Sequence, residues 1–71
     1  MDVLRGKTYI DSRGWMYRVM SGIGEDRFKA RYCKPDKAGW HGVKKLPWRE
    51  THEEAQADLD KLAQEKGWME A

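Results

Sequence analysis

The most regular pattern in this chain of 71 residues is a run in which charged and apolar side chains alternate, Arg27-Phe28-Lys29-Ala30-Arg31-Tyr32-Cys33. Successive side chains of a β-strand point to opposite faces of a sheet, so a period of two is typical of a strand with one buried face. The run predicts a strand at residues 27–33. One face carries aromatic and small side chains, and the other carries basic ones.

The segments on either side of this run predict further strands. Residues 15–20 are rich in aromatic and β-branched side chains, and residues 7–11 form a shorter run of the same kind. A last short strand is expected at residues 43–46. Val43 and Leu46 cannot share one face of a regular strand, so either a bulge interrupts this strand or one of the two side chains is exposed.

The last third of the chain predicts one helix at residues 52–66. Thr51 and Glu54 have the spacing of a capping box, and Gly67 stands where a left-handed residue commonly ends a helix. Trp68 is then placed to fold back on the last turn. An apolar stripe recurs at helical spacing through Ala55, Leu59, Leu62 and Ala63. The expected solvated face holds the acidic residues Glu54, Asp58, Asp60 and Glu65.

Strands followed by one helix predict a single α+β domain spanning residues 1–71. We expect a three-stranded antiparallel sheet, or a four-stranded one, packed on the C-terminal helix. The face turned to the helix is expected to hold Trp15, Tyr17, Val19, Phe28, Ala30 and Tyr32. The chain offers no second element to cover the opposite face, which is expected to hold Met16, Arg18, Met20, Arg27, Lys29 and Arg31.

The charges are distributed unevenly along the chain. There are 14 Lys and Arg against 12 Asp and Glu, a formal net charge of +2. Residues 1–49 hold 12 basic and 5 acidic side chains, a net +7, and residues 50–71 hold 2 and 7, a net −5. The predicted sheet is therefore basic and the predicted helix acidic. Such a sheet face either attracts a polyanion or is a solvated surface.

Several classes of protein do not fit this composition. No run approaches the ~20 apolar residues of a membrane-spanning helix. A chain this short has a thin core, which argues against an independent enzyme. The one cysteine, Cys33, cannot form an internal disulfide, and with no signal-peptide pattern the expected location is the cytoplasm. Cys33, His41 and His52 match no paired zinc spacing, so neither a metal nor a cofactor is expected.

The basic outer face favours binding to double-stranded DNA. Lysine and arginine that meet phosphates release counterions, and arginine recognises the guanine edge in the major groove. The candidates for base contacts are Arg18, Arg27 and Arg31. The candidates for phosphate contacts are Lys29, Lys44 and Lys45. Trp40 either lies against a sugar or base or covers the core.

The order of these segments resembles the AP2-like DNA-binding fold of plant AP2 transcription factors and of the arm-binding domains of phage and transposon integrases. The resemblance rests on Trp15-Met16-Tyr17-Arg18-Val19, the strand from Arg27 to Tyr32, Leu46-Pro47-Trp48, and Thr51-His52-Glu53-Glu54-Ala55. It covers about residues 13–66. It implies a three-stranded sheet that lies in the major groove with a helix behind it, in a protein of a phage or mobile element.

Three alternatives remain open at this point. A row of basic side chains on a strand can simply be a solvated face. The chain can also be a protein-interaction module that binds a host factor, with anchors such as Trp40, Trp68, Met16 and Met20. A homodimer that pairs through an exposed strand would likewise cover the sheet.

Overall fold

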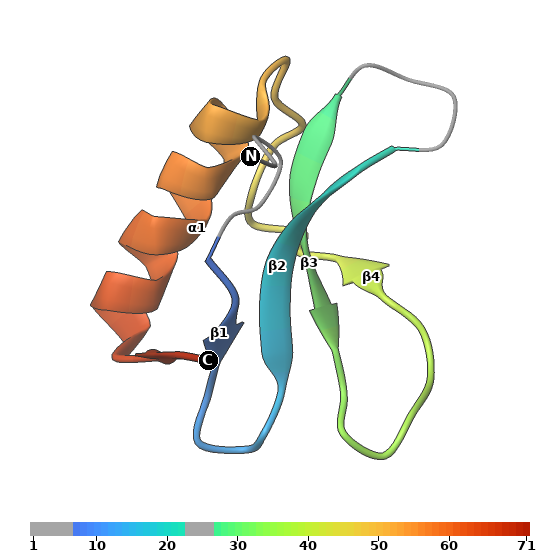
Figure 1. Ribbon diagram of the computed structural model, residues 1–71, viewed down its shortest axis with the longest axis vertical. Coiled ribbons are helices and arrows are strands. Elements are labelled where there is room, and N and C mark those ends of the chain that lie inside the picture. Colours follow the sequence, from blue (N-terminus) through green and yellow to red (C-terminus); the bar gives the residue numbers. More distant parts are fainter. Residues whose placement is uncertain (1–6, 23–26) are drawn as a thin grey trace.

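The computed structural model describes residues 7–22 and 27–71. In these residues an antiparallel sheet of five strands forms one layer and a helix covers one of its faces (Figure 1). The elements are β1 (Tyr9–Ile10), β2 (Met16–Ser21), β3 (Phe28–Cys33), β4 (His41–Gly42), α1 (His52–Lys66) and β5 (Met69–Glu70). The strands lie in the order β4-β3-β2-β1-β5. The predicted α+β class is confirmed, with more strands than the three or four expected.

The pairing of β2 with β3 forms the centre of the sheet. Tyr17 lies opposite Tyr32 and Val19 opposite Ala30, and these side chains face α1. Strand alternation then turns the intervening residues to the outer face. The strands predicted at residues 15–20 and 27–33 agree with β2 and β3 to within one residue at each end.

Helix α1 has the predicted limits because its capping groups are local in sequence. The side chain of Thr51 accepts a hydrogen bond from the N–H of Glu54 at 3.1 Å, and its hydroxyl donates to the Glu54 carboxylate, also at 3.1 Å. At the other end Gly67 adopts φ 74°, a left-handed conformation that glycine takes without steric cost. The N–H of Trp68 bonds back to the carbonyl of Ala63 at 2.9 Å.

The core lies between α1 and the inner face of β1, β2 and β3. Its central residue is Leu59, which is completely buried. The other members of the core cluster are Tyr9, Tyr17, Val19, Ala30, Ala55 and Ala63. The predicted apolar stripe of the helix is therefore the buried stripe. In the part of the chain that is described, no helix is long and apolar enough to span a membrane.

The strand predicted at residues 43–46 is wrong. The strand in this region is β4, and residues 43–46 form a turn in which the N–H of Leu46 donates to the carbonyl of Val43 at 3.2 Å. A turn returns the chain toward the same side, so Val43 and Leu46 both pack against the core. Val43 and Leu46 would point to opposite faces of a regular strand, and the turn explains why both are nevertheless partly buried.

A shift of the pairing along β3 produces this turn. If the pairing of β4 continued unbroken, residue 45 would lie opposite Phe28. Phe28 instead pairs with Arg49 through two hydrogen bonds of 2.7 Å, so four extra residues leave the sheet edge (49 − 45 = 4). The guanidinium of Arg49 binds the Asp58 carboxylate of α1 through Nε at 2.7 Å and Nη2 at 3.2 Å. This ion pair ties the shifted pairing to the helix.

The sequence predicted that the acidic residues of α1 lie on a solvated face, but two of them contact other parts of the structure. Asp58 holds Arg49, and Asp60 accepts a hydrogen bond from the Tyr9 hydroxyl at 2.6 Å. This hydrogen bond raises the pKa of Tyr9 to about 12. Two carboxylates of the acidic helix therefore connect it to the sheet and stabilise the packing of the two layers.

Strand β5 was not predicted. After Gly67 the chain returns along β1, where Met69 pairs with Ile10 and the N–H of Ala71 donates to the carbonyl of Thr8 at 2.7 Å. The ring of Trp68 stacks on Tyr17 with 3.8 Å between ring centres. The end of the chain is thus part of the sheet.

The burial of Leu59 gives a test of the packing. Leu59→Ala should lower the free energy of unfolding by about 2–5 kcal/mol, because it leaves a cavity at the centre of the core. Gln64→Ala, at an exposed position of the same helix, should change it by less than about 0.5 kcal/mol. Urea unfolding of both variants measures the difference. Equal stabilities would contradict the assigned packing face of α1.

Candidate nucleic-acid interface

The outer face of β2 and β3 is lined by basic and sulfur-containing side chains. Arg18 lies directly opposite Arg31, and Met20 opposite Lys29. The third outer pair is Met16 with Cys33. The described part of the chain places no helix over this face, because α1 packs on the other one (Figure 1).

The Arg18–Arg31 pair is electrostatically unfavourable in the isolated protein. Like charges directly opposite each other on neighbouring strands are destabilising. The ion pairs within residues 7–22 and 27–71 join Lys7 to Glu70, Arg13 to Asp11 and Arg49 to Asp58. None of these involves Arg18, Lys29 or Arg31. Among the residues that the structure describes, no carboxylate forms an ion pair with these three cations.

Two tryptophan rings lie beside these cations. The guanidinium of Arg18 is 5.8 Å from the ring centre of Trp40. The ring of Trp48 is 5.5 Å from the Lys29 ammonium and 5.8 Å from the Arg31 guanidinium. Trp40 is half-buried, and Trp48 is 41% exposed. Of the two predicted places for Trp40, the outer face is the one it takes, since it is not among the side chains packed on the core.

The sequence analysis did not assign Trp48 to this face. The shift in pairing decides its place: with Arg49 opposite Phe28, Trp48 falls beside Lys29 on the outer side. A regular strand at residues 43–46 gives no such register. The signal available in the sequence was Pro47, which interrupts a strand and permits the pairing to restart.

The predicted site residues do not all come together. Arg27 is exposed immediately before β3, next to the outer basic residues. Lys44 and Lys45 lie in the turn of residues 43–46, where they face Leu62 and Lys66 of α1. Their grouping with the outer face is therefore corrected: these two lysines belong to the helix side of the sheet. The name "outer basic face" is used below for Arg18, Arg27, Lys29, Arg31, Trp40 and Trp48.

The part of the outer surface next to β1 and β5 is apolar. Ile10 lies between Met16 and Met69 in the strand pairing, so the three side chains share one face. Met16 is 37% exposed and Met69 73% exposed. The side of the sheet that faces away from α1 therefore combines a cationic half on β2 and β3 with an apolar half where β1 and β5 adjoin Met16.

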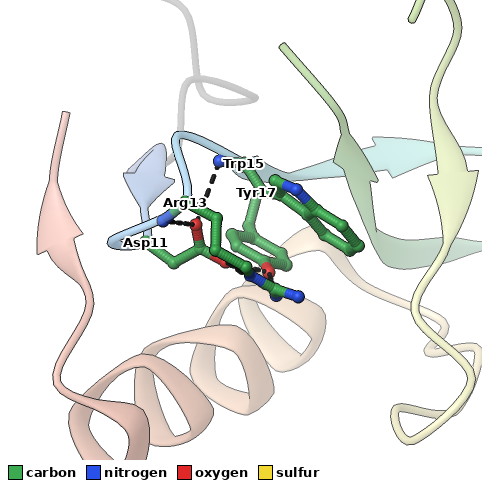
Figure 2. Close-up of polar contacts among 4 residues, drawn as sticks. All are labelled: Asp11, Arg13, Trp15 and Tyr17. Carbon is green, nitrogen blue, oxygen red and sulfur yellow. Dashed lines mark hydrogen bonds and ion pairs between the residues drawn. The ribbon is translucent and has the colours of Figure 1, made fainter. Parts of the chain in front are cut away.

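The hairpin between β1 and β2 is held by the carboxylate of Asp11 (Figure 2). One oxygen accepts the backbone N–H of Arg13 at 2.8 Å and of Trp15 at 3.0 Å. The other accepts the Tyr17 hydroxyl at 2.7 Å and the Arg13 Nη2 at 2.9 Å. The turn also needs Gly14, whose φ of 85° lies in the left-handed region. These bonds fix the register with which β2 enters the sheet.

This hydrogen-bonded cluster shifts two acid–base equilibria. Burial raises the pKa of Tyr17 to about 12, and its hydrogen bond to Asp11 acts in the same direction. Burial acts to raise the pKa of Asp11, but the hydrogen bonds from Tyr17, Arg13 and the backbone outweigh it, so this pKa lies below its usual value. Asp11 is thus a satisfied structural anion.

The residues considered for metal binding or nucleophilic catalysis have other surroundings. The thiol of Cys33 lies 3.7 Å from the carbonyl of Lys34. His41 lies against Tyr32, and His52 meets the ring of Phe28 edge-on. Among the described residues, no three His, Cys, Asp or Glu side chains are grouped so as to hold a metal ion.

Comparison of the chain with protein-family models, curated proteins and solved structures found no match.

The lowered pKa of Asp11 gives a prediction for stability against pH. Its unfolded pKa is about 3.9, so its charged hydrogen bonds contribute fully above that pH and are lost as pH falls through the lower folded pKa. Asp11→Asn should lower the free energy of unfolding at pH 7 by about 1.5–3 kcal/mol and make its decline toward pH 2 shallower. Urea unfolding across this pH range provides the measurement.

Asp36→Asn is the matched control, because Asp36 is exposed in the loop after β3. This variant should keep both the stability and the pH dependence of the original protein. If Asp11→Asn behaved in the same way as Asp36→Asn, the structural role of the Asp11 carboxylate would be refuted.

Proposed function

We propose that this protein is a small DNA-binding module that contacts duplex DNA with its outer basic face. The observation that carries the proposal is the pairing of Arg18 with Arg31 on the uncovered side of the sheet, with Lys29 beside them. These like charges cost stability in the free protein. A polyanion would relieve that repulsion, and the nearby Trp40 and Trp48 rings offer flat surfaces for a sugar or base.

The spacing of this surface suits the major groove. The groove is wide enough to admit a two-stranded β-ribbon, and β2 and β3 form such a ribbon. Arg18 and Arg31 lie at its centre, where a guanidinium can donate two hydrogen bonds to one guanine. Arg27 and Lys29 lie at the start of β3, away from the centre of the ribbon, where they can meet phosphates.

The resemblance to the AP2-like fold supports this proposal independently of charge. That family presents an antiparallel sheet to the major groove and packs a helix behind it. Here α1 packs on the face of β2 and β3 opposite the outer basic face. We further propose that the protein acts by binding rather than by catalysis, in the cytoplasm, and that it comes from a phage or mobile element.

A salt series on duplex DNA tests the proposal. Each phosphate contact contributes a slope of about −0.9 to log affinity against log salt concentration. Replacing Arg27, Lys29 and Arg31 together with Gln should weaken binding strongly at low salt. If all three side chains contact phosphates, the slope should become shallower by about 2–3. Fluorescence anisotropy of a labelled duplex measures both quantities.

The control variant also loses three positive charges, but at other positions: Lys7, Lys37 and Lys61 are replaced by Gln. These side chains are exposed and lie outside the outer basic face. This variant should keep most of the affinity and the original slope. Equal loss in the two triple variants would show that only net charge matters. Absence of duplex binding at low salt would remove the proposal altogether.

The apolar half of the outer surface favours a second candidate, a protein-interaction module. Methionine and tryptophan are common interface anchors, and Met16, Met69 and Trp48 are all exposed. The partner would be a host protein or a second copy of the chain. Under this function Met16→Gln with Met69→Gln, or Trp40→Ala, would abolish partner capture, whereas the triple basic variant would not. A stoichiometric pull-down, with a concentration-dependent mass measurement for the dimer, distinguishes the two candidates.

A further inference from the structure

The side of the sheet opposite the outer basic face is hollowed beside α1. A cleft of about 490 Å³ opens between the β1–β2 hairpin, the turn of residues 43–46 and the last turns of α1. Small-molecule sites typically occupy roughly 300–1,000 Å³. The cleft is therefore large enough for a compact organic ligand, and nothing in the outer-face proposal uses it.

Aromatic, aliphatic and basic side chains line this cleft, and the guanidinium of Arg13 lies 3.7 Å from the ring centre of Trp15. Trp15 stacks on Tyr32 with 5.4 Å between ring centres, and Trp68 stacks on Tyr17 at 3.8 Å. All four rings line the cleft, and Leu62 contributes an aliphatic side chain. The hydrogen bonds of Asp11 hold the hairpin that carries Trp15 and Tyr17 (Figure 2). The aromatic surface is thus fixed before any ligand arrives, which lowers the entropic cost of binding.

The lining also carries basic side chains and no acidic one. Lys44 and Lys45 come from the turn, Lys66 from the end of α1, and Arg13 from the hairpin. Arg13 is already paired with Asp11, at 2.9 Å. No ion pair within the described residues involves any of the three lysines. They therefore supply positive charge at an aromatic cleft.

The turn that carries Lys44 and Lys45 exists because of the four-residue shift in pairing along β3. An unbroken strand would alternate these two lysines between the faces of the sheet. The shift instead places both beside Lys66. Arg49 and Asp58 hold the shifted pairing, so the fold determines the backbone positions of Lys44 and Lys45 beside the cleft.

We propose that this cleft binds a nucleotide, with the planar base against Trp68 beside the Trp15–Tyr32 stack and the phosphate on Lys44, Lys45 and Lys66. Flat rings and clustered ammonium groups match the two halves of this ligand class, an aromatic ring and an anion. A free mononucleotide and the unpaired end of a nucleic-acid strand share this chemistry. The proposal does not depend on duplex binding by the outer basic face.

The four tryptophans allow a direct test by NMR, because their indole N–H signals report on two separate surfaces. Trp15 and Trp68 belong to the cleft, and Trp40 and Trp48 to the outer basic face. Titration with deoxyadenosine monophosphate should shift the signals of Trp15 and Trp68 and leave the other two in place. A short single-stranded oligonucleotide tests the second source. Saturable shifts at the cleft pair with either ligand would support the proposal and identify the source.

A variant at the two exposed lysines of the turn tests the phosphate contacts. Lys44→Gln with Lys45→Gln should weaken nucleotide binding about tenfold or more, since each lost charge-assisted contact corresponds to roughly that factor. Lys7→Gln with Lys37→Gln is the charge-matched control and should bind as the original protein does. The Arg27, Lys29 and Arg31 triple variant should also retain the cleft shifts. Because this last variant alters only the outer basic face, it shows whether nucleotide binding in the cleft and duplex binding by the outer face are independent.

Three results would overturn the nucleotide assignment. The first is no movement of the Trp15 and Trp68 signals with either nucleotide ligand. The second is equal affinity for deoxyadenosine or for inorganic phosphate alone, because the base and the phosphate are both required. The third is equal nucleotide affinity in the Lys44, Lys45 variant and in its control.

Discussion

The pairing of β2 with β3 determines which side chains lie on each face of the sheet. With Val19 opposite Ala30, the inner face is small and apolar enough to receive Leu59 of α1. The same register places Arg18 opposite Arg31 on the outer face. A slip of one residue would exchange these two sets, burying arginine and exposing the core residues. The stability of the fold and the concentration of positive charge therefore depend on one alignment of two strands.

The two ends of this arrangement are held by carboxylates that accept hydrogen bonds from nearby parts of the chain. Asp11 fixes the entry into β2, and the Arg49–Asp58 pair fixes the chain after β4. The acidic residues of α1 therefore do more than balance the positive charge of the sheet. Asp58 and Asp60 use its negative charge for tertiary contacts. By contrast, Arg18, Lys29 and Arg31 of the outer face form no ion pair with any described residue.

The parts of the structure that could be predicted from the sequence are those encoded locally. The alternation in residues 27–33 and the capping groups Thr51 and Gly67 lie within or beside the elements that they define. The turn at residues 43–46 depends instead on Phe28 pairing with Arg49, a contact across the sheet. Strand β5 is two residues long and relies on its bonds with β1. For the same reason the outer placement of Arg18, Lys29 and Arg31 was predicted, whereas the outer placement of Trp48 was missed and Lys44 and Lys45 were wrongly grouped with that face.

The central claim is that the outer face of the sheet, and not the helix, is the surface that meets duplex DNA. An amide chemical-shift titration with a short unlabelled duplex tests it most directly. The account predicts saturable shifts at Arg18, Lys29 and Arg31 and around Trp48, with the amides of α1 from Ala55 to Ala63 unmoved. Shifts confined to α1, or a spectrum that the duplex does not change, would contradict it.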